Sequence, residues 1–139
     1  MRDHAYIHHG VKIDSTSCPF CHPETKDIIV KNAFWYARWD AFPATRGHLL
    51  IIPFRHCPDY FDTTEEEQAS LPEMLFACKK ILDEKFSSAG YNIVINVGEA
   101  ADQRVMHCHV HMIPRYTTDA DDLPGGIQGF VIERPERVI

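Results

Sequence analysis

The sequence has no long apolar run, and this absence excludes a conventional membrane-spanning helix. Its first residues, MRDHAYIHHGVKIDSTS, include no apolar segment typical of a signal peptide. Internal repeats and low-complexity tracts are also absent. The five cysteines are an odd number and do not have the spacing of a disulfide framework, which favours a reducing compartment. We therefore expect a cytoplasmic protein with no membrane partner.

Positive charge is scarce as well. The 139 residues include 14 Lys and Arg against 20 Asp and Glu, for a formal net charge of −6. Nucleic-acid-binding domains neutralise phosphates with clustered basic side chains, so we expect no specific nucleic-acid partner. A small phosphorylated ligand is still compatible with this charge, because it needs only local hydrogen-bond donors. The length and a 45% hydrophobic content fit one globular domain.

The pattern of apolar residues predicts several short strands and one main helix. Strands are expected over residues 27–32, 34–40, 48–53 (a central one) and 91–97, with a further short strand near 130–132. The helix should begin after Thr63 or Thr64, and Pro72 should kink it or open a second helix. Five residues recur at helical spacing on its core face: Leu71, Leu75, Cys78, Leu82 and Phe86. Dominant strands with short connections predict an α+β domain with mostly antiparallel pairing.

The segment VMHCHVHMIPR, residues 105–115, places His107, His109 and His111 at alternate positions. On a helix such residues would not meet, whereas on a strand they share a face at a spacing of roughly 6.5–7 Å. Three imidazoles are costly to bury without partners, and a solvent-facing strand that carries them by chance is the weaker interpretation. The segment therefore indicates a metal site, a nucleophilic site, or both.

A second motif, CPFC, joins Cys18 to Cys21. A redox dithiol would need a strand before it and a helix after it, and this context is poor for that role. Alternatively the motif supplies half of a zinc site, with two more ligands from His22, His48, His56 or a triad histidine. Two buried, unligated cysteines are the third interpretation.

The stretch INVGEAADQRVMHCHVHMIPR closely resembles the signature of the histidine triad (HIT) superfamily of nucleotide hydrolases and transferases. GHLLIIPFRH resembles the second landmark of that superfamily, and many bacterial members have an N-terminal Cys-x-x-Cys. PRY and GGIQGFVI are similar to a bacterial branch of diadenosine polyphosphate hydrolases. The resemblance runs from Cys18 onward, which divides the chain into an N-terminal extension, residues 1–17, and a HIT-like domain, residues 18–139.

The resemblance implies a mainly antiparallel sheet of about five strands with one main helix and short helical pieces, in a homodimer. It also implies hydrolysis or nucleotidyl transfer at the α-phosphorus of a dinucleoside polyphosphate or a nucleoside phosphoramidate. His109 would attack the phosphorus and form a covalent nucleotidyl-histidine, while His111 would serve the phosphate oxygens and the leaving group. A polyphosphate substrate would bring a divalent cation with it.

Other roles carry over from the resemblance position by position. Asp40 matches a ribose contact, although a turn-forming Asp explains it equally well. Asn96 matches a phosphate contact, Gln103 a leaving-group contact, and His48 a histidine packed behind the triad. The zinc-bearing relatives imply a structural zinc on four ligands: Cys18, Cys21, His56 and His107.

The chain departs from the family pattern at two positions. Asp102 replaces the usual glycine, and Arg104 replaces the usual Ser or Thr. We expect Arg104 to form a salt bridge with Asp102 rather than to bind a second phosphate.

Two rival functions remain at this stage. One is a metal-dependent hydrolase with a catalytic metal held by the three triad histidines. The other is a non-catalytic nucleotide-binding module.

Overall fold

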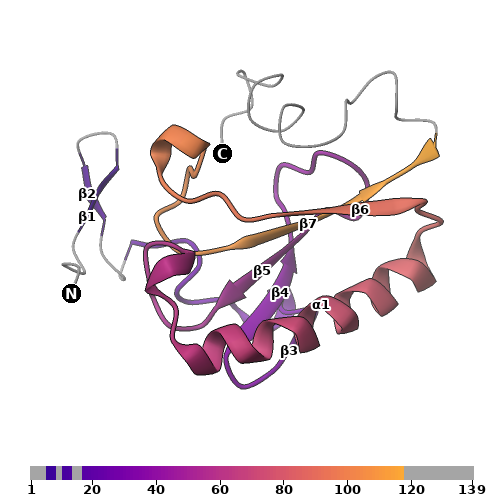
Figure 1. Cartoon of the computed structure of the whole chain (residues 1–139), viewed down its shortest axis with the longest axis horizontal. Coiled ribbons are helices and arrows are strands. Elements are labelled where there is room, and N and C mark those ends of the chain that lie inside the picture. The colour runs from indigo at the N-terminus through magenta and orange to yellow at the C-terminus, as the bar shows by residue number, and fades with distance from the viewer. Residues whose placement is uncertain (1–5, 9–10, 14–16, 118–139) are drawn as a thin grey trace.

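A computed structural model describes residues 6–8, 11–13 and 17–117. Within them a five-stranded antiparallel sheet has the order β3-β4-β5-β7-β6, and one long helix, α1, lies along the sheet (Figure 1). The strands of this sheet are β3 Val30–Lys31, β4 Trp35–Trp39, β5 Leu49–Pro53, β6 Gly90–Val94 and β7 Val110–Arg115. The helix α1 is Glu65–Lys85, and the 3₁₀ turns are η1 Thr25–Asp27, η2 Tyr60–Asp62 and η3 Glu99–Ala101. The predicted α+β architecture with five strands and one main helix is confirmed.

The start of α1 follows from its first four residues. Thr64 accepts a hydrogen bond from the Glu67 amide at 3.1 Å, and the Glu67 carboxylate accepts one from the Thr64 amide at 2.8 Å. This reciprocal capping box satisfies two amides that a helix start leaves without helical partners. The helix then continues through Pro72 to Lys85. Of the two outcomes expected at Pro72, a kink or a second helix, the second helix is absent, because the packing of one face of α1 outweighs the loss of a single backbone hydrogen bond.

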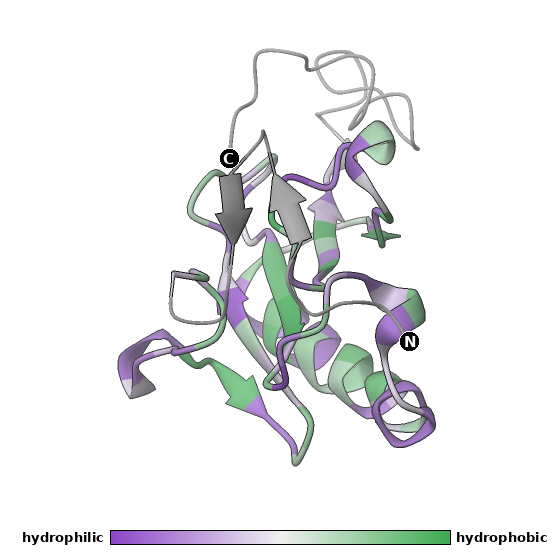
Figure 2. Cartoon of the chain, turned by 90° about the vertical axis from the view of Figure 1, so that its left-hand side faces the viewer, coloured by the Kyte–Doolittle hydropathy of each residue, from purple (hydrophilic) through white to green (hydrophobic). Residues whose placement is uncertain are grey.

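Strand alternation divides the buried side chains between the two faces of the sheet. On one face, residues of the sheet pack against α1; we call this the helix-side core, and it includes Trp35, Ala37, Leu49, Ile51, Cys78, Leu82, Val110 and Met112. The opposite face carries the second cluster, Cys18, Phe20, Tyr36, Leu50 and Ile52. In Figure 2 the strands at the centre of the molecule are the most hydrophobic. The N-terminal CPFC segment therefore covers the sheet face opposite the helix.

The histidine segment differs from its prediction. The strand begins at Val110, so that His107 and His109 precede it and only His111 belongs to β7. The pairing with β6 stops at His111, opposite the last residue of that strand, Val94, and the pairing with β5 stops at Val110, opposite Ile51. The alternation nevertheless continues upstream, because Cys108 joins Val110 in the helix-side core.

Two further segments complete the comparison with the predicted elements. Strands β1 (Tyr6–His8) and β2 (Val11–Ile13) form an antiparallel pair within the N-terminal extension, which the sequence did not predict. The strand expected near residues 130–132 lies outside the described residues. No helix within the described ranges is long and apolar enough to cross a membrane.

Candidate functional site

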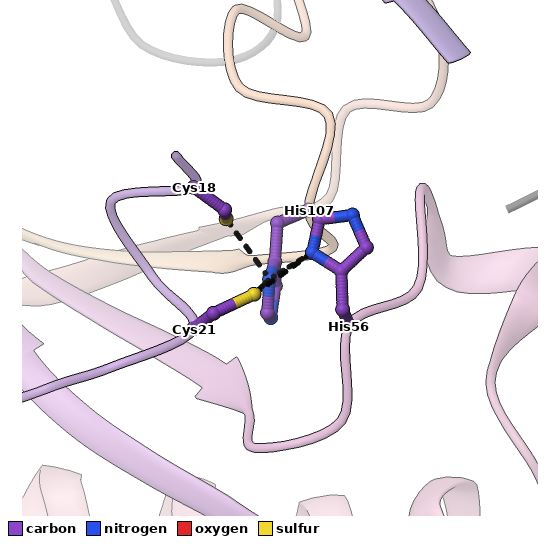
Figure 3. Close-up of side chains that lie close together, drawn as sticks. All are labelled: Cys18, Cys21, His56 and His107. Carbon is purple, nitrogen blue, oxygen red and sulfur yellow. Dashed lines mark hydrogen bonds between the residues drawn. The ribbon is translucent and has the colours of Figure 1, made fainter. Parts of the chain in front are cut away.

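Four side chains from three separate segments converge beside the sheet (Figure 3). Cys18 and Cys21 come from the CPFC loop, His56 follows β5, and His107 precedes β7. Cys18 Sγ lies 3.3 Å and Cys21 Sγ 3.5 Å from His107 Nδ1, and Cys21 Sγ lies 2.9 Å from His56 Nδ1. The two Nδ1 atoms are 3.1 Å apart, and all four ligand atoms lie within 4.8 Å of one another. The structure thus brings together the four residues predicted to bind zinc.

These distances match the edges of a zinc coordination tetrahedron. Zinc bond lengths of about 2.05 Å to nitrogen and 2.3 Å to sulfur give edges of about 3.3 Å between two nitrogens and about 3.6 Å between nitrogen and sulfur. The distances of 3.1, 3.3 and 3.5 Å lie within about 0.3 Å of these edges, whereas the 2.9 Å from Cys21 Sγ to His56 Nδ1 is about 0.7 Å shorter than its edge. A Cys₂His₂ set also fills all four positions, so a zinc ion here would hold no catalytic water.

The position of the hydrogen on the His107 ring favours a role of His107 as a metal ligand. Its Nε2 lies 2.8 Å from the Pro53 carbonyl oxygen, which can only accept, so Nε2 carries the hydrogen and Nδ1 presents its lone pair to the cluster. Burial lowers the pKa of His107 to about 4. Burial, followed by the contact with Cys18, raises the pKa of the Cys21 thiol to about 12. A metal ion would displace the proton of this thiol on binding.

His109 is buried next to this cluster, and its ring is oriented by a backbone group. Nδ1 lies 2.8 Å from the carbonyl oxygen of His107, so Nδ1 donates and Nε2 retains a lone pair. Burial lowers the pKa of His109 and keeps the ring neutral. The Phe20 ring meets His109 edge-on at 5.2 Å between centroids and His107 at 5.9 Å. The sequence analysis did not single out Phe20, although it lies inside the CPFC motif.

A second buried group contains Asp40, His48 and His111. His48 Nε2 lies 2.9 Å from His111 Nδ1 and 3.2 Å from Asp40 Oδ2, and His111 Nδ1 lies 3.9 Å from the same oxygen. His48 Nδ1 accepts the Ala44 amide hydrogen at 2.9 Å, and Asp40 Oδ1 accepts that of Phe42 at 2.8 Å. His48 thus lies behind His111, as predicted. Asp40 is only 6% exposed and faces this histidine pair. Its predicted contact with ribose would require an approach to a buried carboxylate.

The loop between β6 and β7 contains the other predicted contacts. Gln103 is buried: its Nε2 donates to the carbonyls of Pro58 (2.6 Å) and Val105 (3.0 Å), and its Oε1 accepts from Gly98 at 2.8 Å. A leaving-group contact would have to replace one of these internal bonds. Asn96 is half-buried just past the end of β6, within 3.5 Å of the Asp102 carbonyl.

The two departures from the family pattern lie in the same loop. The predicted salt bridge between Arg104 and Asp102 is present. Asp102 has φ +67°, in the left-handed region, which accounts for the usual glycine at this position; Asp is among the residues that tolerate this conformation.

Comparisons with known proteins agree with this geometry. The family model described as HIT domain matches residues 23–118. A 16.1 kDa HIT-like protein from Mycoplasma pneumoniae is 32% identical over 108 residues, which cover 75% of each chain. AP-4-A phosphorylase from Mycobacterium tuberculosis is 27% identical over 76% of this chain but only 55% of its own length.

The solved structures include a Zn-bound histidine triad family protein from Mycobacterium smegmatis. It matches with a TM-score of 0.67 and 35% identity, and the match covers 76% of this chain and 79% of that one. The family match, the shared fold and the alternating histidines with a Cys₂His₂ cluster beside them lead to one conclusion: this chain belongs to the HIT family.

Proposed function

We propose that this protein is a nucleotide hydrolase or nucleotidyl transferase that acts at the α-phosphorus of a nucleotide through His109. The observation that carries the proposal is the hydrogen bond from His109 Nδ1 to the His107 carbonyl. This bond leaves Nε2 as an unprotonated nucleophile, and the lowered pKa of the buried ring keeps it so at neutral pH. Attack by Nε2 on phosphorus displaces the leaving group and gives a nucleotidyl-histidine. Water or another acceptor then attacks the phosphorus, takes the nucleotidyl group and releases His109.

His111 is placed to assist this attack. Its ring centroid lies 5.0 Å from that of His109, on the same face of the chain. A donor at this position can stabilise charge on the phosphate oxygens or protonate the leaving group. Asp40, Asn96 and Gln103 remain proposed contacts of ribose, phosphate and leaving group.

Zinc is proposed as a structural ion on Cys18, Cys21, His56 and His107, supported by the tetrahedral spacing of these ligands and by the Zn-bound relative. Such an ion ties the N-terminal segment to His107, two residues before the proposed nucleophile. Its chemistry here is coordination alone, since four protein ligands leave no open position.

Likeness to AP-4-A phosphorylase supports a dinucleoside polyphosphate as substrate, which would bind together with a divalent cation. A nucleoside phosphoramidate presents the same α-phosphorus and is the alternative substrate class. Assembly as a homodimer belongs to this proposal too.

The deciding experiment compares two alanine variants. His107→Ala should lose zinc and melt at a lower temperature, because binding of a structural metal contributes directly to folding. His109→Ala should keep its zinc and its melting temperature but lose turnover by several orders of magnitude, since no covalent intermediate can form. Rapid-quench trapping of a nucleotidylated wild-type protein with diadenosine polyphosphate completes the test.

The rival functions give different results in the same experiment. Release of metal by His109→Ala would support a catalytic metal on the three histidines. Nucleotide binding without turnover in the wild-type protein would support a binding module. Full activity in both variants would show that the histidine face is not the active site.

A further inference from the structure

Asp40 lies at one end of the loop between β4 and β5, and His48 lies at the other end. The Asp40 amide donates to the His48 carbonyl at 3.0 Å and closes this loop. Asp40, His48 and Leu50 all lie on the sheet face that bears His111, which is paired with Leu50 across the β5–β7 ladder. The loop thus places a carboxylate and an imidazole directly behind His111.

The Ala44 amide determines which nitrogen of His48 carries a hydrogen. An amide can only donate, so the 2.9 Å contact requires a lone pair on His48 Nδ1. The neutral ring must then carry its hydrogen on Nε2, the atom that faces both His111 Nδ1 and Asp40 Oδ2. His48 is therefore a donor at this contact, and it cannot accept a hydrogen from His111 there.

This restriction matters when His111 carries two protons. A neutral His111 can accept from His48 at Nδ1 and present Nε2–H to the substrate. A doubly protonated His111 has a hydrogen on Nδ1 as well, which would oppose the Nε2–H of His48. The Asp40 carboxylate lies 3.9 Å from His111 Nδ1 and 3.2 Å from His48 Nε2, so its negative charge is the counter-charge that can stabilise a doubly protonated His111.

We propose that Asp40 is a positioning residue that allows His111 to act as the proton donor to the leaving group. The proposal rests on the proposed function of the triad. When His109 Nε2 bonds to phosphorus and the bond to the leaving group breaks, His111 Nε2–H passes to that group. His111 is left neutral with its hydrogen on Nδ1, on the side that faces the Asp40 carboxylate, and with a lone pair on Nε2. That lone pair takes the proton of the attacking water as the phosphorus–His109 bond breaks, which restores both histidines.

A second metal site is the competing use of these three residues, because their ligand atoms also lie close together. The hydrogen on His48 Nε2 argues against it, since that atom has no lone pair for a metal. In the Cys₂His₂ cluster, by contrast, His107 Nε2 donates to the Pro53 carbonyl, so its Nδ1 has a lone pair that faces the other ligands. We therefore expect one zinc per chain.

The test uses Asp40→Asn, with Asp59→Asn as matched control. Asp59 is 5% exposed, and like Asp40 it accepts the amide of the residue two positions on, at 2.9 Å from Phe61. Each variant keeps that acceptor oxygen and replaces the other, charged oxygen by an NH2 group, and Asp59 belongs to the cap of η2. Two substrates are compared: an alkylamine phosphoramidate of AMP, whose leaving group needs a proton, and the p-nitrophenyl ester of AMP, whose leaving group needs none.

Asp40→Asn should lower kcat on the phosphoramidate by about 10²-fold, within the usual contribution of general acid catalysis, and should change the ester reaction much less. Asp59→Asn should alter neither. An unchanged kcat on the phosphoramidate, with a rise in KM that is absent for 2′,3′-dideoxy analogues, would overturn the proposal, because Asp40 would then act as a ribose contact alone. Equal losses of kcat on both substrates would also overturn it.

A second measurement does not depend on turnover. Long-range ¹⁵N–¹H correlation spectra of the zinc-loaded protein should show His48 protonated on Nε2 and not on Nδ1. The titratable groups facing His111 include Asp40, His48 and His109. Asp40→Asn should make His111 lose its second proton at a lower pH. A His48 protonated on Nδ1, a His111 titration that Asp40→Asn leaves unchanged, or a second bound zinc would overturn the proposal. A wild-type protein that cleaves neither substrate but shows the expected spectra would refute the proposed function alone.

Discussion

Acid should destabilise the zinc-free protein through His107, by an amount that follows from its burial. The pKa of His107 is lowered from 6.5 to about 4 in the folded protein, first by burial. The folded state thus binds a proton less readily than the unfolded chain, so stability is fully present above pH 6.5 and is lost as the pH falls from 6.5 towards 4. At 1.36 kcal/mol per unit, the loss is about 3 kcal/mol. His107 is fully buried, so solvent does not screen this effect.

The assay is urea unfolding of chelator-treated protein between pH 7 and pH 4, for the wild type and for His107→Gln. Glutamine does not titrate in this range, so the stability advantage of the wild type over the variant should shrink by about 3 kcal/mol as the pH falls. His109, whose pKa is also lowered, contributes equally to both proteins and cancels in the difference. His22→Gln, at an exposed position, is the control and should follow the wild type. A constant difference between wild type and His107→Gln across the range would refute the reasoning.

Three further predictions concern assembly, the nucleophile and the loop before the triad. Light scattering should give about twice the 16.0 kDa chain mass, and a monomeric wild type would contradict the homodimer. Ile93 lies on the edge strand β6 and is 51% exposed, so Ile93→Lys should favour the monomer. Phe20→Leu keeps most of the side-chain volume, so it should keep zinc and cost less than about 1.5 kcal/mol of stability. It should lower turnover, because the ring beside His109 is lost. Metal analysis and kcat measurements test both expectations. Asp102→Gly should change stability by less than about 1 kcal/mol, whereas Asp102→Val should cost about 1–2 kcal/mol for a branched residue at φ +67°, as thermal melts would show.

Local patterns in the sequence were enough to predict the architecture. The capping residues at Thr64, the helical spacing from Leu71 to Phe86 and the apolar run 48–53 each depend on neighbours within a few residues, and each prediction is confirmed. The start of β7 could not be predicted in this way. It depends on where the pairing of β7 with β5 and β6 stops, and those strands are distant in the sequence. The same is true of Pro72, where packing against the sheet outweighs a local helix-breaking tendency.

The candidate site divides along the same line. The zinc ligands and the triad could be named because their motifs resemble a known family, and the structure brings those ligands together. The contact of Asp40 with the His48–His111 pair could not be predicted, because it forms only when the loop 40–48 closes and places both of its ends beside β7. The sequence contained one usable signal: Tyr36, Arg38 and Asp40 alternate on β4 and its extension, so that Asp40 had to lie on the histidine face.

What distinguishes the histidines of this site is the backbone group that each ring meets. His107 and His109 donate to carbonyl oxygens, of Pro53 and of His107, and each therefore keeps a lone pair on its other nitrogen. In His107 that lone pair faces two thiols and a second imidazole, which suits a metal. In His109 the lone pair is the one that we propose attacks phosphorus. His48 differs because its Nδ1 accepts the Ala44 amide hydrogen. Its Nε2, which faces His111, must therefore carry the ring hydrogen and donate. A donor there cannot serve His111 when His111 carries its own proton on that side, so a carboxylate is needed beside the pair. Because the Ala44 amide fixes the hydrogen of His48 on Nε2, a doubly protonated His111 needs the negative charge of Asp40 beside it. Removing the charge of Asp40 should therefore matter only for reactions in which the leaving group must be protonated.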